Sequence, residues 1–158
     1  MPVAVADFSS VDFARLTAWH EIDKIDTADG DTQLLAGTGV AGFNDGPADA
    51  ASFGSPYYCD VDSAGNTFVA DQMNHAIRKV VSSGYTTTVA GTGASGTTDN
   101  VIGVQATFDR PWGIAIDGND YVYVGERGNQ ALRLIAPNDY VSTLSLPVTI
   151  IAPRTVAV

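Results

Sequence analysis

The sequence predicts an all-β fold made of repeated four-stranded units, and three observations lead to this prediction. First, the string Ala36-Gly-Thr-Gly39 returns as Ala90-Gly-Thr-Gly93, which is 54 residues later. Second, the chain between these strings consists of short runs rich in Val, Ile, Tyr, Phe and Thr, bounded by Gly, Asn, Asp or Ser, as is typical of antiparallel hairpins. Third, four such runs fit within one unit, which matches a blade of a β-propeller.

The later part of the unit repeats with a shift of 55 residues, and one inserted loop residue explains the change of shift. A fixed period of this size is typical of repeat architectures, in which each unit gains stability by stacking on its neighbours. The recurring pairs are Phe53 with Phe108, Pro56 with Pro111, Asp62 with Asp117, Asn74 with Asn129, Arg78 with Arg133, and Thr88 with Thr143.

We expect about three blades plus one extra strand, that is, a partial propeller or one completed by oligomerisation. The first blade covers about 1–36, and its expected strands are Pro2–Ala6, Phe13–Ala18, Trp19–Ile25 and Thr32–Ala36. The second blade covers about 37–90, with strands at Tyr57–Val61, Thr67–Ala70, Ala76–Val81 and Thr86–Ala90. The third blade covers about 91–146 in the same pattern, and 147–158 begins a fourth.

Long loops, Thr38–Ser55 and Thr92–Arg110, join each blade to the next. The first loop contains the turn signal Asn44-Asp-Gly-Pro47, and then Ala48–Phe53, which can form one helical turn. Because such loops share one face of a propeller, they offer its best binding surface. The candidate binding residues are Asn44, Asp45 and Asp49, whereas Phe53 and Phe108 are expected to fill the gaps between adjacent blades.

The repeat resembles the NHL-repeat β-propeller family over two full units and parts of two more. The resemblance rests on Ala36-Gly-Thr-Gly39, Gly42-Phe-Asn-Asp-Gly46, Ala51-Ser-Phe53, Asp62–Asp71 and Asn74–Val80. The Asn-His-Leu signature of the family corresponds to Asn74-His75-Ala76 and Asn129-Gln130-Ala131. The resemblance is specific for fold, favours an extracellular or cell-surface location, and implies a structural turn in which Asp71, Asn74, Glu126 and Asn129 bond backbone amides.

Composition excludes several classes of partner. The net charge of −10, with 8 Lys and Arg residues, disfavours nucleic acid, because such binding requires cations that neutralise phosphates. The acidic pI of about 4.2 also disfavours adsorption to anionic membranes. No apolar run is long enough to span a bilayer, and the first 20 residues show no signal peptide. Cys59 is the single cysteine and is expected to be a buried structural thiol.

No constellation in the sequence predicts catalysis, a metal or a cofactor. Asp60 and Asp62 precede a glycine as in a calcium loop, but an acidic hairpin turn is the better interpretation. Some enzymes that resemble this family are lyases that hold a metal with channel-lining histidines. His20 and His75 both precede a third strand instead, away from the channel. On that strand Arg78 and Arg133 recur, each with an acid such as Asp71 or Glu126 as its expected partner.

We therefore expect a non-enzymatic module for protein interaction or assembly, with protein, and chiefly another copy of itself, as partner. Two copies would close a ring of about six blades, and repeated head-to-tail donation would give a filament. The expected assembly strand comprises Pro153, Arg154, Val156 and Val158, added to a partner blade. Two alternatives remain open: a fragment of a larger extracellular propeller that binds a ligand, and a lyase whose catalytic residues lie outside this chain.

Overall fold

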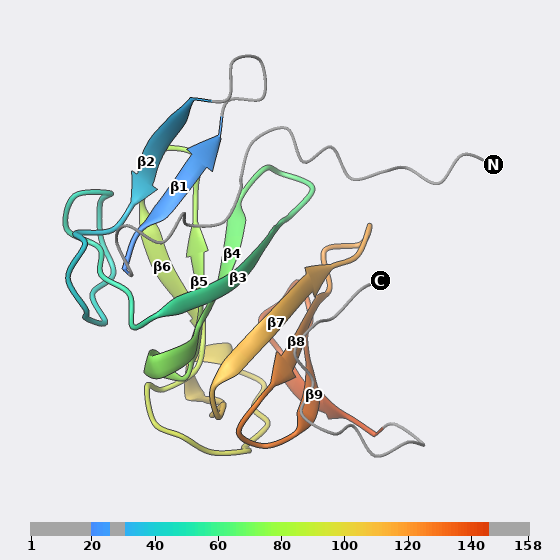
Figure 1. The fold of residues 1–158 in the computed structure, drawn as a ribbon. Helices are drawn as coiled ribbons and strands as arrows, with labels where there is room; N and C mark the ends of the chain where they lie inside the picture. Colours follow the sequence, from blue (N-terminus) through green and yellow to red (C-terminus); the bar gives the residue numbers. More distant parts are fainter. Residues whose placement is uncertain (1–19, 26–30, 146–158) are drawn as a thin grey trace.

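The computed structural model describes residues 20–25 and 31–145, and nearly all of its regular structure is β-strand, as predicted (Figure 1). The described part of the first blade contains β1 (Ile22–Ile25) and β2 (Thr32–Ala36). The second blade has β3 (Pro56–Val61), β4 (Thr67–Asp71), β5 (Ala76–Val80) and β6 (Thr86–Ala90). The third has β7 (Pro111–Ile116), β8 (Val122–Glu126), β9 (Ala131–Ile135) and β10 (Val141–Leu144).

The second and third blades are separate antiparallel sheets with their strands in chain order, and β1 pairs with β2 in a third sheet. This arrangement is the predicted succession of hairpins, because each strand pairs with the next one along the chain. The strands expected at Pro2–Ala6 and Phe13–Ala18, and the assembly strand from Pro153 to Val158, lie outside the described residues.

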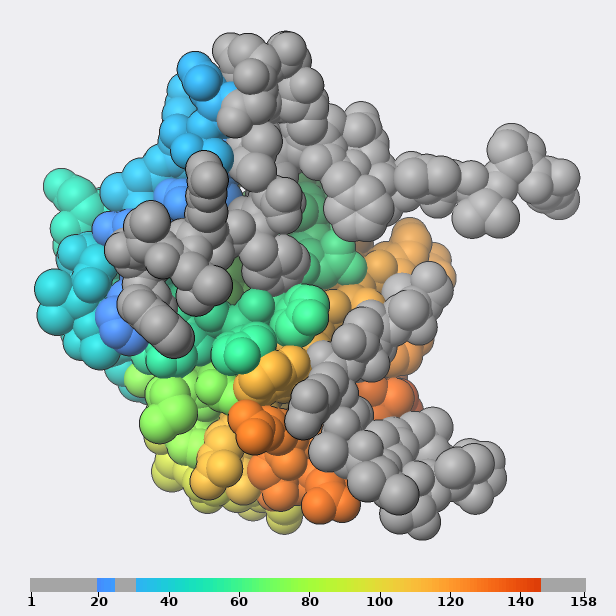
Figure 2. All heavy atoms as spheres, viewed as in Figure 1, coloured from blue at the N-terminus to red at the C-terminus, as the bar shows by residue number. Residues whose placement is uncertain are grey.

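The sheets are held together by apolar side chains between them. One buried cluster joins Ile22 and Ala36 of the first blade to Val69 and Val80 of the second, with Phe53 among them. Another joins the second blade to the third. Its larger members are Phe68, Ile77, Phe108, Ile114, Val124 and Ile135. Both Phe53 and Phe108 are fully buried. In Figure 2 the second blade (green) packs directly against the third (orange).

Strand β4 shows why the blades need neighbours on both sides. All five of its residues, Thr67 to Asp71, are buried, although side chains of a strand alternate between two faces. Both faces of the second blade are therefore covered, one by the first blade and one by the third. An isolated sheet could not achieve this, which is the physical basis of stacking in repeat proteins.

Polar contacts also tie the first strands of the second and third blades together. The Asp60 carboxylate accepts a hydrogen bond from the Ile116 N–H at 2.7 Å. In the adjacent hairpins, the Ser63 N–H and hydroxyl donate to the Asp120 carboxylate at 2.8 and 2.7 Å. The neighbouring blades are thus fixed in register by hydrogen bonds as well as by the core.

The long loops begin and end at one end of the blades, called here the loop end, and the middle of each runs along the fourth strand, where Gly46 pairs with Thr86 and Asn100 with Val141. The turns after β4 and β8 also lie at the loop end, and the first of them contains a short helix, η1 (Gln72–Asn74). The first loop forms one turn close to the helical turn expected at 48–53, in which the Ala51 N–H donates to the Pro47 carbonyl at 2.9 Å. The second loop contains η2 (Gly103–Gln105). Within the described residues, no helix has the length and apolar character needed to cross a membrane.

Candidate functional site

A buried arginine organises the loop end of the second blade. Arg78 projects from β5, and its side chain is fully buried. Its Nη1 donates to the Ser52 carbonyl at 3.0 Å and to Asp71 Oδ2 at 2.8 Å. Its Nη2 donates to the Asn44 carbonyl at 2.8 Å and to Asp45 Oδ1 at 2.7 Å. A single guanidinium therefore joins a central strand to both halves of the long loop.

The third blade repeats this arrangement atom for atom. Arg133 Nη1 donates to the Thr107 carbonyl at 2.8 Å and to Glu126 Oε2 at 3.2 Å. Its Nη2 donates to the Thr98 carbonyl at 3.0 Å and to Asp99 Oδ1 at 2.7 Å. Because a catalytic constellation is needed once rather than once per blade, this recurrence favours a structural role for these charged groups.

The predicted turn residues belong to the same network. Asp71 Oδ1 accepts a hydrogen bond from the Gly54 N–H at 2.6 Å, and Asn74 Nδ2 donates to Asp71 at 2.8 Å and to the Gly42 carbonyl at 2.6 Å. The matching bonds of the third blade involve Glu126 with the Asp109 N–H, and Asn129 with Glu126 and the Gly96 carbonyl. These side chains bind the long loop to the end of the blade.

Burial and hydrogen bonding act in opposite directions on the acids of the network. Burial raises the pKa of Asp71 and of Glu126, although their hydrogen bonds and the neighbouring arginines oppose the rise. Burial also acts to raise the pKa of Asp99, but there the hydrogen bonds from Thr143 and Arg133 outweigh it and the pKa is lowered. The network thus combines an inner, buried acid with an outer acid that is stabilised as a carboxylate.

Polar groups of the candidate binding loop mostly make hydrogen bonds that hold the loop against its own blade. Besides Arg78, the Asp45 carboxylate accepts hydrogen bonds from the Thr88 N–H and hydroxyl, both at 3.0 Å. Asn44 contributes its carbonyl to Arg78, whereas Asp49 is exposed. An open groove of about 570 Å³ lies between the two long loops, with Phe43 and Asp45 on one side and Val104 on the other.

Both histidines lie where one blade meets the next. Nδ1 of His20 accepts a hydrogen bond from the Ser55 N–H at 3.4 Å, and Nδ1 of His75 accepts one from the Arg110 N–H at 3.2 Å. Ser55 and Arg110 each have a left-handed backbone, with φ of 62° and 52°. Each histidine therefore accepts a hydrogen bond from the residue that precedes the first strand of the next blade. In the part of the chain that the structure describes, no three potential metal ligands come together.

The two aspartates considered for calcium have separate partners. Asp60 bonds the next blade, as described above, while Asp62 accepts hydrogen bonds from the Ala64 and Asn66 N–H groups of its own hairpin. Lys79 Nζ also lies 3.2 Å from Asp62. Asp62 thus forms the acidic hairpin turn that the sequence indicates. Cys59 is partly buried and packs against the cluster between the first and second blades.

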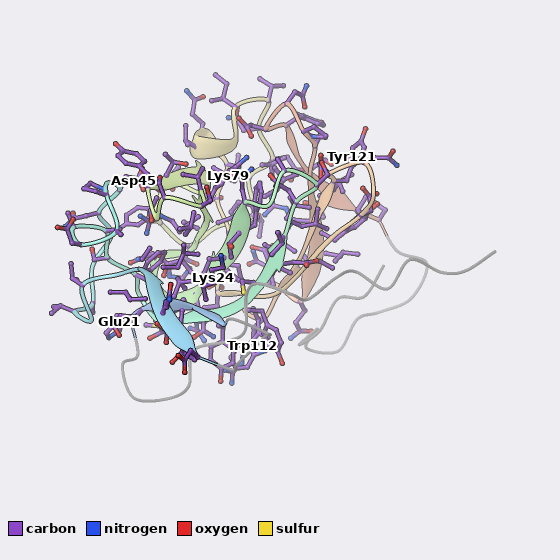
Figure 3. The ribbon with its side chains drawn as sticks, turned by 90° about the horizontal axis from the view of Figure 1, so that it is seen from above. Glu21, Lys24, Asp45, Lys79, Trp112 and Tyr121 are labelled. Carbon is purple, nitrogen blue, oxygen red and sulfur yellow. The ribbon has the colours of Figure 1, made fainter. Side chains whose placement is uncertain are left out.

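An aromatic cluster at the loop end, formed by Tyr57, Trp112 and Arg127, was not singled out from the sequence. Tyr57 and Trp112 each follow the proline that begins the first strand of a blade, and their ring centroids lie 3.5 Å apart at 31°. The Arg127 guanidinium carbon lies 5.0 Å from the Trp112 ring centroid. Figure 3 shows Trp112 well away from Tyr121, which lies in the hairpin at the other end of β7. The signal available in the sequence was an aromatic residue after the proline in both repeats.

The third blade also presents an apolar face on its far side. In the second blade, Phe68 and Ile77 are buried because the third blade covers them, and Val89 packs beside them. The repeat places Tyr123, Leu132 and Leu144 at the same positions of the third blade, and all three are partly exposed. The far face of the third blade is thus apolar like the face of the second blade that the third one covers, but its side chains are less buried.

Comparison with known proteins identifies the class as a β-propeller-like protein. An auxiliary nutrient binding protein from Bacteroides thetaiotaomicron superimposes on 81% of this chain with a TM-score of 0.65 and 23% identity. Virginiamycin B lyase from Staphylococcus aureus superimposes on 85% of the chain with a TM-score of 0.55 and 16% identity. The chain spans about a third of both structures, 33% and 37% of their lengths.

One curated protein has a similar stretch of sequence. Protein SUPPRESSOR OF QUENCHING 1, chloroplastic, from Arabidopsis thaliana is 39% identical over 61 residues, which are 39% of this chain and 6% of that protein. No family model matches the chain. The solved structures therefore establish the fold, and they include both binding proteins and an enzyme.

Proposed function

We propose that the chain is a non-enzymatic assembly module of NHL-like blades, and that it associates with a second copy of itself through the apolar face of its third blade. The observation that carries this proposal is the partial exposure of Tyr123 and Leu132 at positions where the second blade has the buried residues Phe68 and Ile77. Burial of such side chains is worth about 25 cal/mol per Å² of apolar surface. A further blade is the partner whose shape fits this face, because the second blade already binds one there.

The proposal that the module is non-enzymatic rests on the internal hydrogen bonds of its buried charged groups. The second and third blades each engage an arginine, an inner acid and a loop acid in the same internal hydrogen bonds. Groups that are satisfied in this way hold loops in place and are poorly suited to exchange protons with a substrate.

The partner copy would supply either of two surfaces. Its first blade could pack face to face on the third blade, which would close a ring if the rotation allows and build a filament if it does not. Alternatively, the assembly strand of one copy, from Pro153 to Val158, could add to an edge of the other. In a longer protein the next blade of the same chain would occupy the face instead.

Charge substitution on the exposed face tests the proposal. Leu132→Asp places a carboxylate in the contact, and we expect it to shift the 158-residue chain from associated to monomeric in sedimentation velocity at micromolar concentration. Val101→Asp is the matched control, because Val101 is an apolar residue that is 71% exposed on the long loop. Melting curves would show that both variants fold. An associated Leu132→Asp variant would overturn the proposed surface, and a monomeric wild-type chain would overturn self-association.

A further inference from the structure

The aromatic cluster of Tyr57, Trp112 and Arg127 is built on an irregularity that both blades share. The pairing of β3 with β4 and of β7 with β8 shifts next to these aromatic residues, so that each lies in a β-bulge. A bulge turns a side chain away from the regular alternation of the strand, and bulges are frequent beside binding sites. Tyr57 is 42% exposed, and Trp112 is partly exposed. The exposed part of the two packed rings therefore offers an aromatic surface to a ligand.

Arg127 adds a positive charge to this surface. Its side chain is exposed, and no carboxylate of the described residues lies within ion-pair distance of its guanidinium. The other arginines of the described residues differ: Arg78 and Arg133 are buried in the networks, and Arg110 Nε lies 3.8 Å from Asp109. In a chain of net charge −10, the cluster thus holds a cation available to a ligand.

The repeat indicates that Arg127 is not needed to build a blade. The groups that build both blades recur at equivalent positions, as Arg78 and Arg133 do. The residue equivalent to Arg127 in the second blade is Gln72, which is buried and uncharged. A charged, exposed group that occurs in one blade alone is available for recognition.

We propose that Tyr57, Trp112 and Arg127 form a binding site for a small aromatic carboxylate. The ring of the ligand would stack on the exposed aromatic surface, where offset or tilted packing is favourable. Its carboxylate would accept hydrogen bonds from the N–H groups along the edge of the Arg127 guanidinium, which remain free when the face of the guanidinium lies over Trp112. At physiological ionic strength the Debye length is about 8 Å, so the more distant acids of the chain are screened.

Two probes that differ in charge alone test this site. The indole N–H signal of Trp112 is followed by NMR in the Trp19→Phe background while 2-naphthoate or its neutral analogue 2-naphthamide is added. We expect a saturable shift with 2-naphthoate, weakened about tenfold by Arg127→Gln, which corresponds to the loss of one charge-assisted contact. The affinity for 2-naphthamide should be low in wild type and unchanged by Arg127→Gln.

Arg110→Gln is the matched control, because Arg110 is also exposed and lies next to Arg127, whose N–H donates to the Arg110 carbonyl at 3.0 Å. It should change the affinity for 2-naphthoate less than about twofold. The proposal is overturned by the absence of a saturable shift, by equal binding of both probes, or by equal losses in the two arginine variants. Unchanged backbone signals in Arg127→Gln would show that the variant folds.

Discussion

Replacement of Arg78 by methionine tests whether the buried arginine is what holds the long loop to the blade. Methionine keeps much of the length and apolar stem of the side chain but removes four hydrogen bonds, two to carbonyls and two to the carboxylates of Asp71 and Asp45. Asp71 is fully buried and would lose its counter-ion. Removal of one partner from a buried ion pair costs about 3–5 kcal/mol, which is a large part of the stability of an ordinary domain.

Urea denaturation followed by circular dichroism measures this loss. Lys79→Met is the matched control, since Lys79 is the next residue of β5 but is partly exposed, and its pair with Asp62 should contribute about 0–1 kcal/mol. In the double variant Asp71→Asn/Arg78→Met, part of the lost stability should return, because no unpaired charge is then buried. If Arg78→Met were no more destabilising than Lys79→Met, the account of the network would be wrong.

Three further changes probe the packing, the turns and the outer acid. Phe108→Ala should cost about 3–5 kcal/mol in urea denaturation, because it empties the buried space between two blades; Tyr140→Ala, at an exposed site, should change stability by less than about 0.5 kcal/mol. Gly91→Ala should lower the melting temperature, since φ is 105° and the new Cβ would lie 2.5 Å from a carbonyl oxygen, whereas Gly118→Ala meets no atom within 4 Å and should not. Burial alone would raise the pKa of Asp99, but its hydrogen bonds lower it, so the carboxylate stabilises the fold above the unfolded pKa of about 3.9 and this contribution disappears as the pH falls through the folded value. The difference in melting temperature between wild type and Asp99→Asn should therefore shrink below about pH 4; a difference that grows on acidification would contradict this sign.

The strands of the second and third blades could be predicted from the sequence because the same pattern of apolar runs and turns occurs twice. The roles of the loop residues were harder to predict. Asp45 is a candidate binding residue in the sequence because it lies in a long loop, yet it bonds Arg78 and Thr88. The recurrence of an aspartate at Asp99, together with the recurring threonine on the fourth strand, was the signal that favoured a structural role.

The contact between Tyr57 and Trp112 was the least predictable part of the structure. Tyr57 and Trp112 lie far apart in the sequence, and their contact depends on two bulges and on the spacing of two sheets. Local sequence patterns do not encode such a spacing, because it results from the packing of the whole interface. The repeat does, however, show which side chains of the third blade correspond to covered ones of the second.

The mass of the purified 158-residue chain in solution, measured by light scattering after size exclusion, tests the central claim most directly. Association through the third blade predicts a species of at least twice 16.5 kDa at micromolar concentration. A mass of twice the chain would indicate two copies, and larger species that grow with concentration would indicate a filament. A well-folded species of 16.5 kDa across the micromolar range would contradict the claim that a second copy covers this face.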